Sequence, residues 1–158
     1  MMPAHFFLLV FLIGVVTGLR SLTAPAVVCW GAHLGWLALA GTTLGFFAHP
    51  VALILFTIFA IAELVADKLP FVPRRTTPGP LAVRLIFGAL CGAALCVVAK
   101  APLFYGVLLG ALGALIGAYA GYGYRRLIPA DSRAAQFLAA LLEDVIAVGG
   151  GFWVVSRF

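Results

Sequence analysis

The chain has 158 residues, of which 65% are hydrophobic and only 9% are charged. Its mean hydropathy of +1.18 excludes an ordinary soluble domain, in which about half of the residues are apolar. The net charge of +5 has no basic soluble domain to carry it, so nucleic-acid binding is not expected. Membrane lipids are the expected partners of the basic residues.

The apolar runs predict an all-α, polytopic membrane protein with about six transmembrane helices, each of roughly 20 residues. The expected helices cover residues 5–22, 25–47, 50–69, 80–99, 102–124 and 134–156. The first run lacks a basic segment before it and more apolar runs follow, which favours a retained helix over a signal peptide. The second range contains several glycines and His33, and it also fits a broken or re-entrant element.

The basic residues predict the orientation in the membrane. Six spans place eight of the ten on one side, namely Arg20, Lys68, Arg74, Arg75, Arg84, Arg125, Arg126 and Arg133. The positive-inside rule makes that side cytoplasmic, and it predicts a bacterial inner-membrane protein with both termini periplasmic. Lipid headgroups are expected to face the basic residues Lys68, Arg74, Arg75, Arg125 and Arg126.

The two halves of the chain resemble each other. Glu63 follows Pro50 by thirteen residues and Glu143 follows Pro129 by fourteen, and the first helix of each half carries two glycines four residues apart. Because three helices are an odd number, a second copy would be inverted in the membrane, as in many transporters. The expected organisation is one membrane domain, residues 1–158, with repeats at 1–70 and 81–158 joined by a Pro- and Arg-rich linker at 71–80. Chance alignment of frequent Gly and Pro residues, and inversion within an antiparallel homodimer, stay open as alternatives.

Acidic residues inside apolar segments are the candidate functional residues. A charge in the bilayer core costs roughly 2.5–3.5 kcal/mol on insertion scales, so such residues usually face the protein interior. The candidates for transport or ion binding are Glu63, Asp67, Glu143 and Asp144, with Arg20 and Arg84 as pairing partners. One interpretation is that the pairs only hold the bundle together. The other is that Glu143 or Glu63 exchanges a proton or binds a cation during transport.

Catalytic and metal sites are not indicated. His5, His33 and His49 match no metal spacing, and the buried-looking cysteines are expected to be packing residues. Ser21 lies beside Arg20, but no base is tied to it by local sequence. An enzyme is therefore the least favoured class, and no cofactor is expected.

Five segments resemble a family of small bacterial membrane proteins known only as domain of unknown function four-one-two-six. They read GLRSLTAPAVV (18–28), ELVADKLP (63–70), RRTTPGP (74–80), GALCGA (88–93) and LEDVIAVGGG (142–151). The resemblance covers nearly the whole chain and implies a multi-pass inner-membrane protein. It implies no activity, substrate or site residue.

The favoured function is a small transporter or channel-like protein with acidic residues at the repeat interface, acting on a small ion or small molecule. A chain of 158 residues forms a thin bundle, so a homo-oligomer, most simply a homodimer, is expected. The alternative is a non-transporting protein for lipid binding or membrane assembly, whose buried charges are structural.

Overall fold

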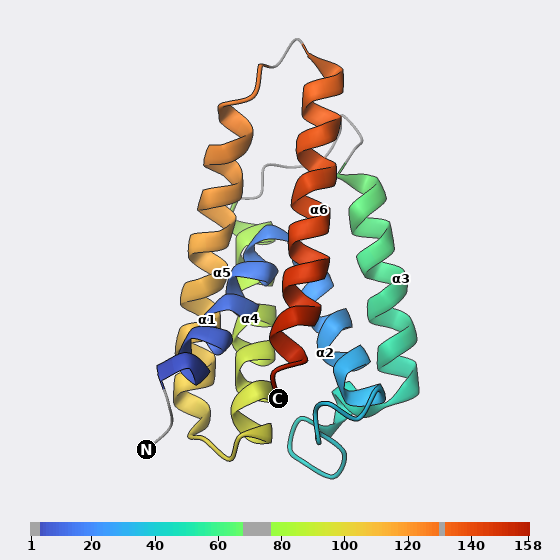
Figure 1. Ribbon diagram of the computed structural model, residues 1–158, viewed down its shortest axis with the longest axis vertical. Helices are drawn as coiled ribbons and strands as arrows, with labels where there is room; N and C mark the ends of the chain where they lie inside the picture. The colour runs from blue at the N-terminus through green and yellow to red at the C-terminus, as the bar shows by residue number, and fades with distance from the viewer. Residues whose placement is uncertain (1–3, 68–76, 130–131) are drawn as a thin grey trace.

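The computed structural model describes residues 4–67, 77–129 and 132–158. Within these ranges the chain forms six α-helices and one short 3-10 helix, with no strand. They are α1 (Ala4–Leu19), α2 (Thr23–His33), η1 (Gly45–Ala48), α3 (Pro50–Ala66), α4 (Pro78–Val98), α5 (Leu103–Arg126) and α6 (Arg133–Val155). Successive α-helices run in alternating directions, so both ends of the described chain lie at the same end of the bundle (Figure 1). The all-α prediction is confirmed.

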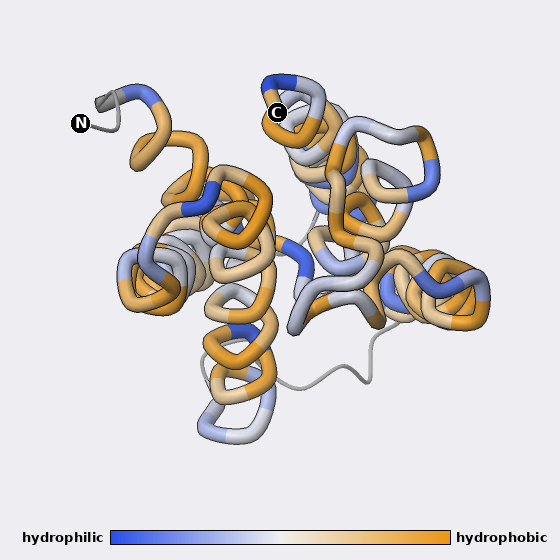
Figure 2. The backbone as a smooth tube through the Cα atoms, turned by 90° about the horizontal axis from the view of Figure 1, so that it is seen from below, coloured by the Kyte–Doolittle hydropathy of each residue, from blue (hydrophilic) through white to orange (hydrophobic). Residues whose placement is uncertain are grey.

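In the described part of the chain, three helices, α4, α5 and α6, are long and apolar enough to cross a membrane. The helices α1 and α3 are apolar but shorter, with 16 and 17 residues. Apolar residues also cover outward faces: within α3 only Ala60 is buried, while Ile54 and Phe59 are half exposed. Figure 2, seen from below, shows orange apolar stretches throughout the bundle and few blue hydrophilic ones. A helix that is apolar all round is typical of a membrane environment.

The predicted second span is wrong, because α2 ends at His33 instead of continuing to residue 47. Gly35 and Gly41 have φ angles of +80° and +75°, which lie in the left-handed region and end a right-handed helix. The chain then passes through η1 before Pro50 begins α3. With 11 residues, α2 is a half-length helix, which agrees with the broken-element alternative. The other five helices begin and end within three residues of their predicted limits.

Glycines bring α1, α4 and α5 into backbone contact. A Cβ atom placed on Gly88 would lie 2.6 Å from the carbonyl oxygen of Gly110, and one on Gly106 would lie 2.5 Å from that of Gly92. On α1, Gly14 and Gly18 meet the backbone of α5 in the same way. Small residues spaced by four are how membrane helices approach closely. We call these three helices the glycine-packed group.

The elements α2, α3 and α6 pack through side chains instead. Trp30 of α2 donates its indole N–H to the hydroxyl of Thr57 on α3, at 3.1 Å. Gly151 of α6 lies against the side chain of Val27 on α2. The glycine run at 149–151 remains helical, so it does not break α6. This second group therefore has fewer direct backbone contacts than the first.

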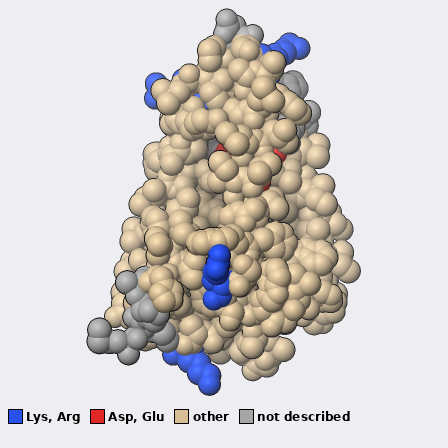
Figure 3. Space-filling model, viewed as in Figure 1, with Lys and Arg blue, Asp and Glu red and all other residues tan. Residues whose placement is uncertain are grey.

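Basic residues of the described chain lie mainly at one end of the bundle. Helices α1, α3 and α5 end there and α4 and α6 begin there, with Arg20, Arg84, Arg125, Arg126 and Arg133 at or near these termini. Lys100 and Arg157 lie at the opposite end. We call the first end the arginine end. In Figure 3 blue basic side chains lie near the top, at the bottom and on the lower central face, while the acidic residues show only as small red areas.

Candidate functional site

Seven charged side chains come together near the arginine end, beside the short non-helical link between α1 and α2. Four are acidic and three are arginines, and they come from five parts of the fold. We call them the charged cluster: Arg20 after α1, Glu63 and Asp67 at the end of α3, Arg84 in α4, Arg125 in α5, and Glu143 and Asp144 in α6. Because α5 and α6 extend beyond the end of α3 (Figure 1), the same cluster lies well inside α6 but at the tip of α3.

Arg20 connects α3 and α6. Its Nη1 lies 2.5 Å from Oδ2 of Asp67, and its Nη2 pairs with Oδ1 of Asp144. The side chain is only 1% exposed, so the guanidinium is almost fully removed from solvent and lipid. A buried charge of this kind is tolerated only when it is paired, and here two carboxylates share it.

Arg125 forms the second bridge, between α3 and α6 from the side of α5. Its Nη2 lies 3.0 Å from Oδ2 of Asp67, and its Nε and Nη2 both donate to Oε2 of Glu143 at 3.1 Å. The sequence placed Arg125 among the headgroup-facing residues, whereas the structure turns its guanidinium inward onto two carboxylates. Its side chain is 22% exposed, so it lies at the edge of the cluster.

Glu63 accepts hydrogen bonds from the residues that link α1 and α2. Its Oε1 accepts from the N–H of Ser21 at 2.9 Å and from the Ser21 hydroxyl at 2.6 Å, and its Oε2 accepts from the N–H of Leu22 at 2.8 Å. These amides precede the first turn of α2, where N–H groups have no partner within the helix. A carboxylate at a helix N-terminus also interacts favourably with the helix dipole.

Arg84 interacts with the end of α1, on the other side of this link. Its Nη1 donates to the carbonyl oxygen of Gly18 at 2.7 Å, near the C-terminus of α1. Its Nη2 lies 3.8 Å from Oε1 of Glu63. A cation therefore lies at the end of α1 and an anion at the start of α2, which is the arrangement that both helix dipoles favour.

The described members of the cluster carry charges of both signs in nearly equal number. Among the described residues it contains four carboxylates and three guanidinium groups, which leaves one formal negative charge when all are ionised. Every carboxylate nevertheless has a guanidinium within 4 Å, so no acidic member is isolated. Asp67, Glu143 and Asp144 also have interactions beyond these pairs.

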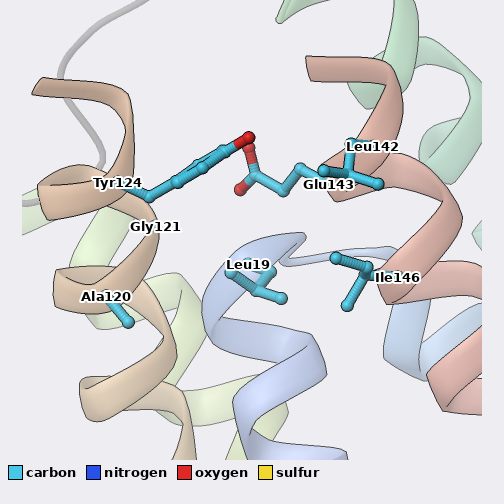
Figure 4. Close-up of a pocket in the computed structure, with 7 residues that line it drawn as sticks. All are labelled: Leu19, Ala120, Gly121, Tyr124, Leu142, Glu143 and Ile146. Carbon is cyan, nitrogen blue, oxygen red and sulfur yellow. The ribbon is translucent and has the colours of Figure 1, made fainter. Parts of the chain in front are cut away.

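A pocket of about 230 Å³ reaches the cluster between α5 and α6. Glu143 is 4% exposed and lines it. The remaining lining residues are Leu19, Ala120, Gly121, Tyr124, Leu142 and Ile146. Figure 4 shows Tyr124 and Glu143 extending toward each other from α5 and α6. The pocket therefore has apolar walls and one acidic end.

The structure brings all six predicted transport residues into the charged cluster. Sequence reasoning missed Arg125 as a member, and it did not connect the Ser21 hydroxyl with Glu63. Arg126 is exposed and its guanidinium lies 5.7 Å from the ring centroid of Tyr122. The other headgroup-facing candidates, Lys68, Arg74 and Arg75, lie outside the described residues. Within the described ranges, no three His, Cys, Asp or Glu side chains form a group that could hold a metal ion.

Comparison with known proteins assigns the chain to a family. A family model described as domain of unknown function DUF4126 matches residues 7–156, which is nearly the whole chain. No curated protein and no solved structure matches it. The match includes every residue of the charged cluster, and the earlier resemblance is confirmed. The chain belongs to the DUF4126 family.

Proposed function

We propose that this protein is a small transport protein of the bacterial inner membrane, and that the charged cluster is the polar centre at which it handles a proton or a monovalent cation. The observation that carries the proposal is the pocket that reaches Glu143, because it gives a nearly buried carboxylate a route to the outside of the protein. A carboxylate lining the pocket would favour a positively charged substrate.

The proposed architecture places the cluster between halves of opposite direction, residues 1–70 and 81–158. In support, α1 and α4 run oppositely, and so do α3 and α6 (Figure 1). The equivalence is partial, because α2 has 11 residues where α5 has 24. The half-exposed apolar face of α3 supports a homodimer, since a second copy could cover it. Both termini would be periplasmic and the arginine end cytoplasmic.

A second candidate function is a structural one, in lipid binding or membrane assembly. The observation that favours it is the pairing of every carboxylate in the cluster with an arginine. Paired charges from five parts of the fold would fix the packing of the bundle without moving anything. This alternative predicts that neutralising Glu143 changes stability but reveals no transport.

Proton flux into proteoliposomes under a pH gradient tests the proposal. Wild-type protein is expected to carry flux above that of empty vesicles, and Glu143→Gln is expected to lower it at least about tenfold, which corresponds to about 1.4 kcal/mol. Glu63→Gln tests the carboxylate away from the pocket. Arg157→Gln changes a charge at the opposite end and serves as the matched control. Flux that is absent, or equal in wild type and Glu143→Gln, would reject transport through this cluster.

A further inference from the structure

We infer that residues 34–49, which connect α2 to α3, are seated in the interfacial layer of the bilayer at the end of the bundle opposite the arginine end. We call this segment the 34–49 loop. Its partner is the lipid layer itself, at the depth where acyl chains meet headgroups. The membrane location is taken from the proposed function, but the loop is seated in this way whether or not the protein transports anything.

The outer surface of the 34–49 loop is apolar and uncharged. The loop lies at the lower end of the bundle in Figure 1, where α2 ends and α3 begins. Its residues Leu34, Trp36 and Phe46 are 50%, 40% and 44% exposed. No Asp, Glu, Lys or Arg occurs in the chain between Arg20 and Glu63. Exposed apolar surface of this kind is typical of a contact with a membrane or a protein, not of a link that faces water.

The inner side of the loop attaches it to the bundle. Leu37 and Phe47 are buried, and the N–H groups of Trp36 and Leu37 both donate to the carbonyl oxygen of Gly31 in α2, at 2.9 and 3.1 Å. The ring of Phe47 stacks on that of Phe56 in α3, with 6.1 Å between centroids. The loop is therefore fixed to both helices, and its exposed apolar side chains have a defined direction.

The backbone at the tip of the loop limits how deep it can lie. Within the described chain, the N–H groups of Ala40, Gly41 and Thr43 donate to no backbone carbonyl, and all three residues are exposed. In the hydrocarbon core such donors would have no partner, which strongly disfavours that position. Water and lipid headgroups can accept from them. The tip therefore belongs at the polar side of the interface, with the apolar side chains nearer the acyl chains.

The tryptophans of the chain mark the same level. The chain has three, and all are described: Trp30 near the end of α2, Trp36 in the loop and Trp153 near the end of α6. The guanidinium of Arg157 lies 5.0 Å from the centroid of the Trp153 ring, so a charge accompanies the aromatic rings at this end. Tryptophan is enriched where the membrane meets water. This placement favours lipid over a second copy of the chain as the partner of the loop.

Fluorescence quenching in lipid vesicles tests the inference. The double variant Trp30→Phe, Trp153→Phe keeps Trp36 as its single tryptophan. Phosphatidylcholine brominated near the headgroup or near the bilayer centre supplies the quenchers in the membrane, and iodide supplies the quencher in water. The shallow bromines are expected to quench Trp36 about twofold more than the deep ones, since a tryptophan at the interface lies near the headgroups. Iodide is expected to quench it less than either lipid does.

A tryptophan on a spanning helix is the matched control. Ile116 lies in the middle part of α5 and is 52% exposed, so Ile116→Trp, with the three native tryptophans replaced by Phe, should be quenched more by the deep bromines. Quenching of Trp36 by iodide alone would overturn the inference. Quenching by none of the three would also overturn it, because protein would then cover the loop. If lipid quenches Ile116→Trp in either case, the membrane location stands and only the inference fails.

A cysteine variant tests the loop with all three tryptophans in place, since Trp30→Phe also removes the hydrogen bond to Thr57. The native cysteines are buried, so bimane should attach to the introduced Phe46→Cys. Its emission is expected at shorter wavelength than that of bimane on Ser156→Cys, which is exposed at the same end of the bundle. Equal emission wavelengths at the two positions would contradict the seating of the loop in lipid.

Discussion

The carboxylate of Glu63 lies 2.9 Å from the backbone N–H of Ser21, a residue 42 positions earlier in the chain. A side chain of α3 thus completes the first turn of α2, which has no side-chain cap of its own. Arg84 completes the end of α1 by donating to Gly18. A carboxylate and a guanidinium from two other helices therefore stabilise the interruption between α1 and α2.

Replacing Glu63 with Gln should destabilise the start of α2. The variant keeps one oxygen acceptor but turns an amide NH₂ toward an N–H donor, and an unsatisfied buried donor costs about 1–3 kcal/mol. The free energy of unfolding in mixed micelles measures the loss, and hydrogen exchange in residues 21–26 locates it. Ser21→Ala, which removes only the hydroxyl bond, should cost less. A larger loss in Ser21→Ala than in Glu63→Gln would contradict this account of the interruption.

Replacing Arg20 with Gln should destabilise the whole bundle. The change removes the Arg20 guanidinium from both Asp67 and Asp144, and breaking a buried ion pair typically costs about 3–5 kcal/mol. The thermal unfolding midpoint in detergent measures the effect. The exposed Arg126→Gln at the same end is the control and should change little. Adding Asp144→Asn to Arg20→Gln should restore part of the stability, since it removes a buried charge that no longer pairs with Arg20.

Alanine substitutions of glycines should separate packing glycines from incidental ones. A Cβ on Gly106 would lie 2.5 Å from a backbone oxygen of α4, so α4 and α5 must move apart in Gly106→Ala. Gly149 has no atom within 4 Å of such a Cβ, so Gly149→Ala should stabilise α6 by up to about 1 kcal/mol. Unfolding midpoints of the two variants should therefore shift in opposite directions. Equal shifts would show that close backbone contact between α4 and α5 is not important for stability.

Cysteine labelling should show that α6 crosses the membrane. The native Cys29, Cys91 and Cys96 are buried, so they should give little background with a membrane-impermeant thiol reagent. Leu127→Cys lies at the arginine end and is 84% exposed, and Ser156→Cys lies at the opposite end. In sealed inverted vesicles only Leu127→Cys should react, and in intact spheroplasts only Ser156→Cys. Reaction of both from one side would exclude the proposed crossing.

The cluster could be anticipated because charges are scarce in this chain. The chain has five acidic residues, and four of them lie in apolar segments, where few arginines are available to pair with them. Arg20 and Arg84 were the two arginines within the expected helices. Glu143 and Asp144 were expected to meet different partners because adjacent residues point about 100° apart on a helix. They pair with Arg125 and Arg20, respectively.

Other features required three-dimensional information. Arg125 stands beside the exposed Arg126 at the end of α5, a position that also suits a headgroup-facing residue, and only the packing of α3 and α6 turns it inward. The range 25–47 was predicted as one span because it is an apolar run of suitable length, with a broken or re-entrant element as the alternative. Gly35 and Gly41 instead adopt positive φ angles, a local conformation that hydropathy does not register.

The close contact among α1, α4 and α5 has a consequence for movement. Where backbone meets backbone, few side chains lie between the helices, so sliding of α1, α4 and α5 past one another would require their backbones to separate. The elements α2, α3 and α6 meet their neighbours through side chains, which can change rotamer. If the proposed transport involves a movement, we expect the second group to move against the glycine-packed group, with Arg20 and Arg125 at the boundary.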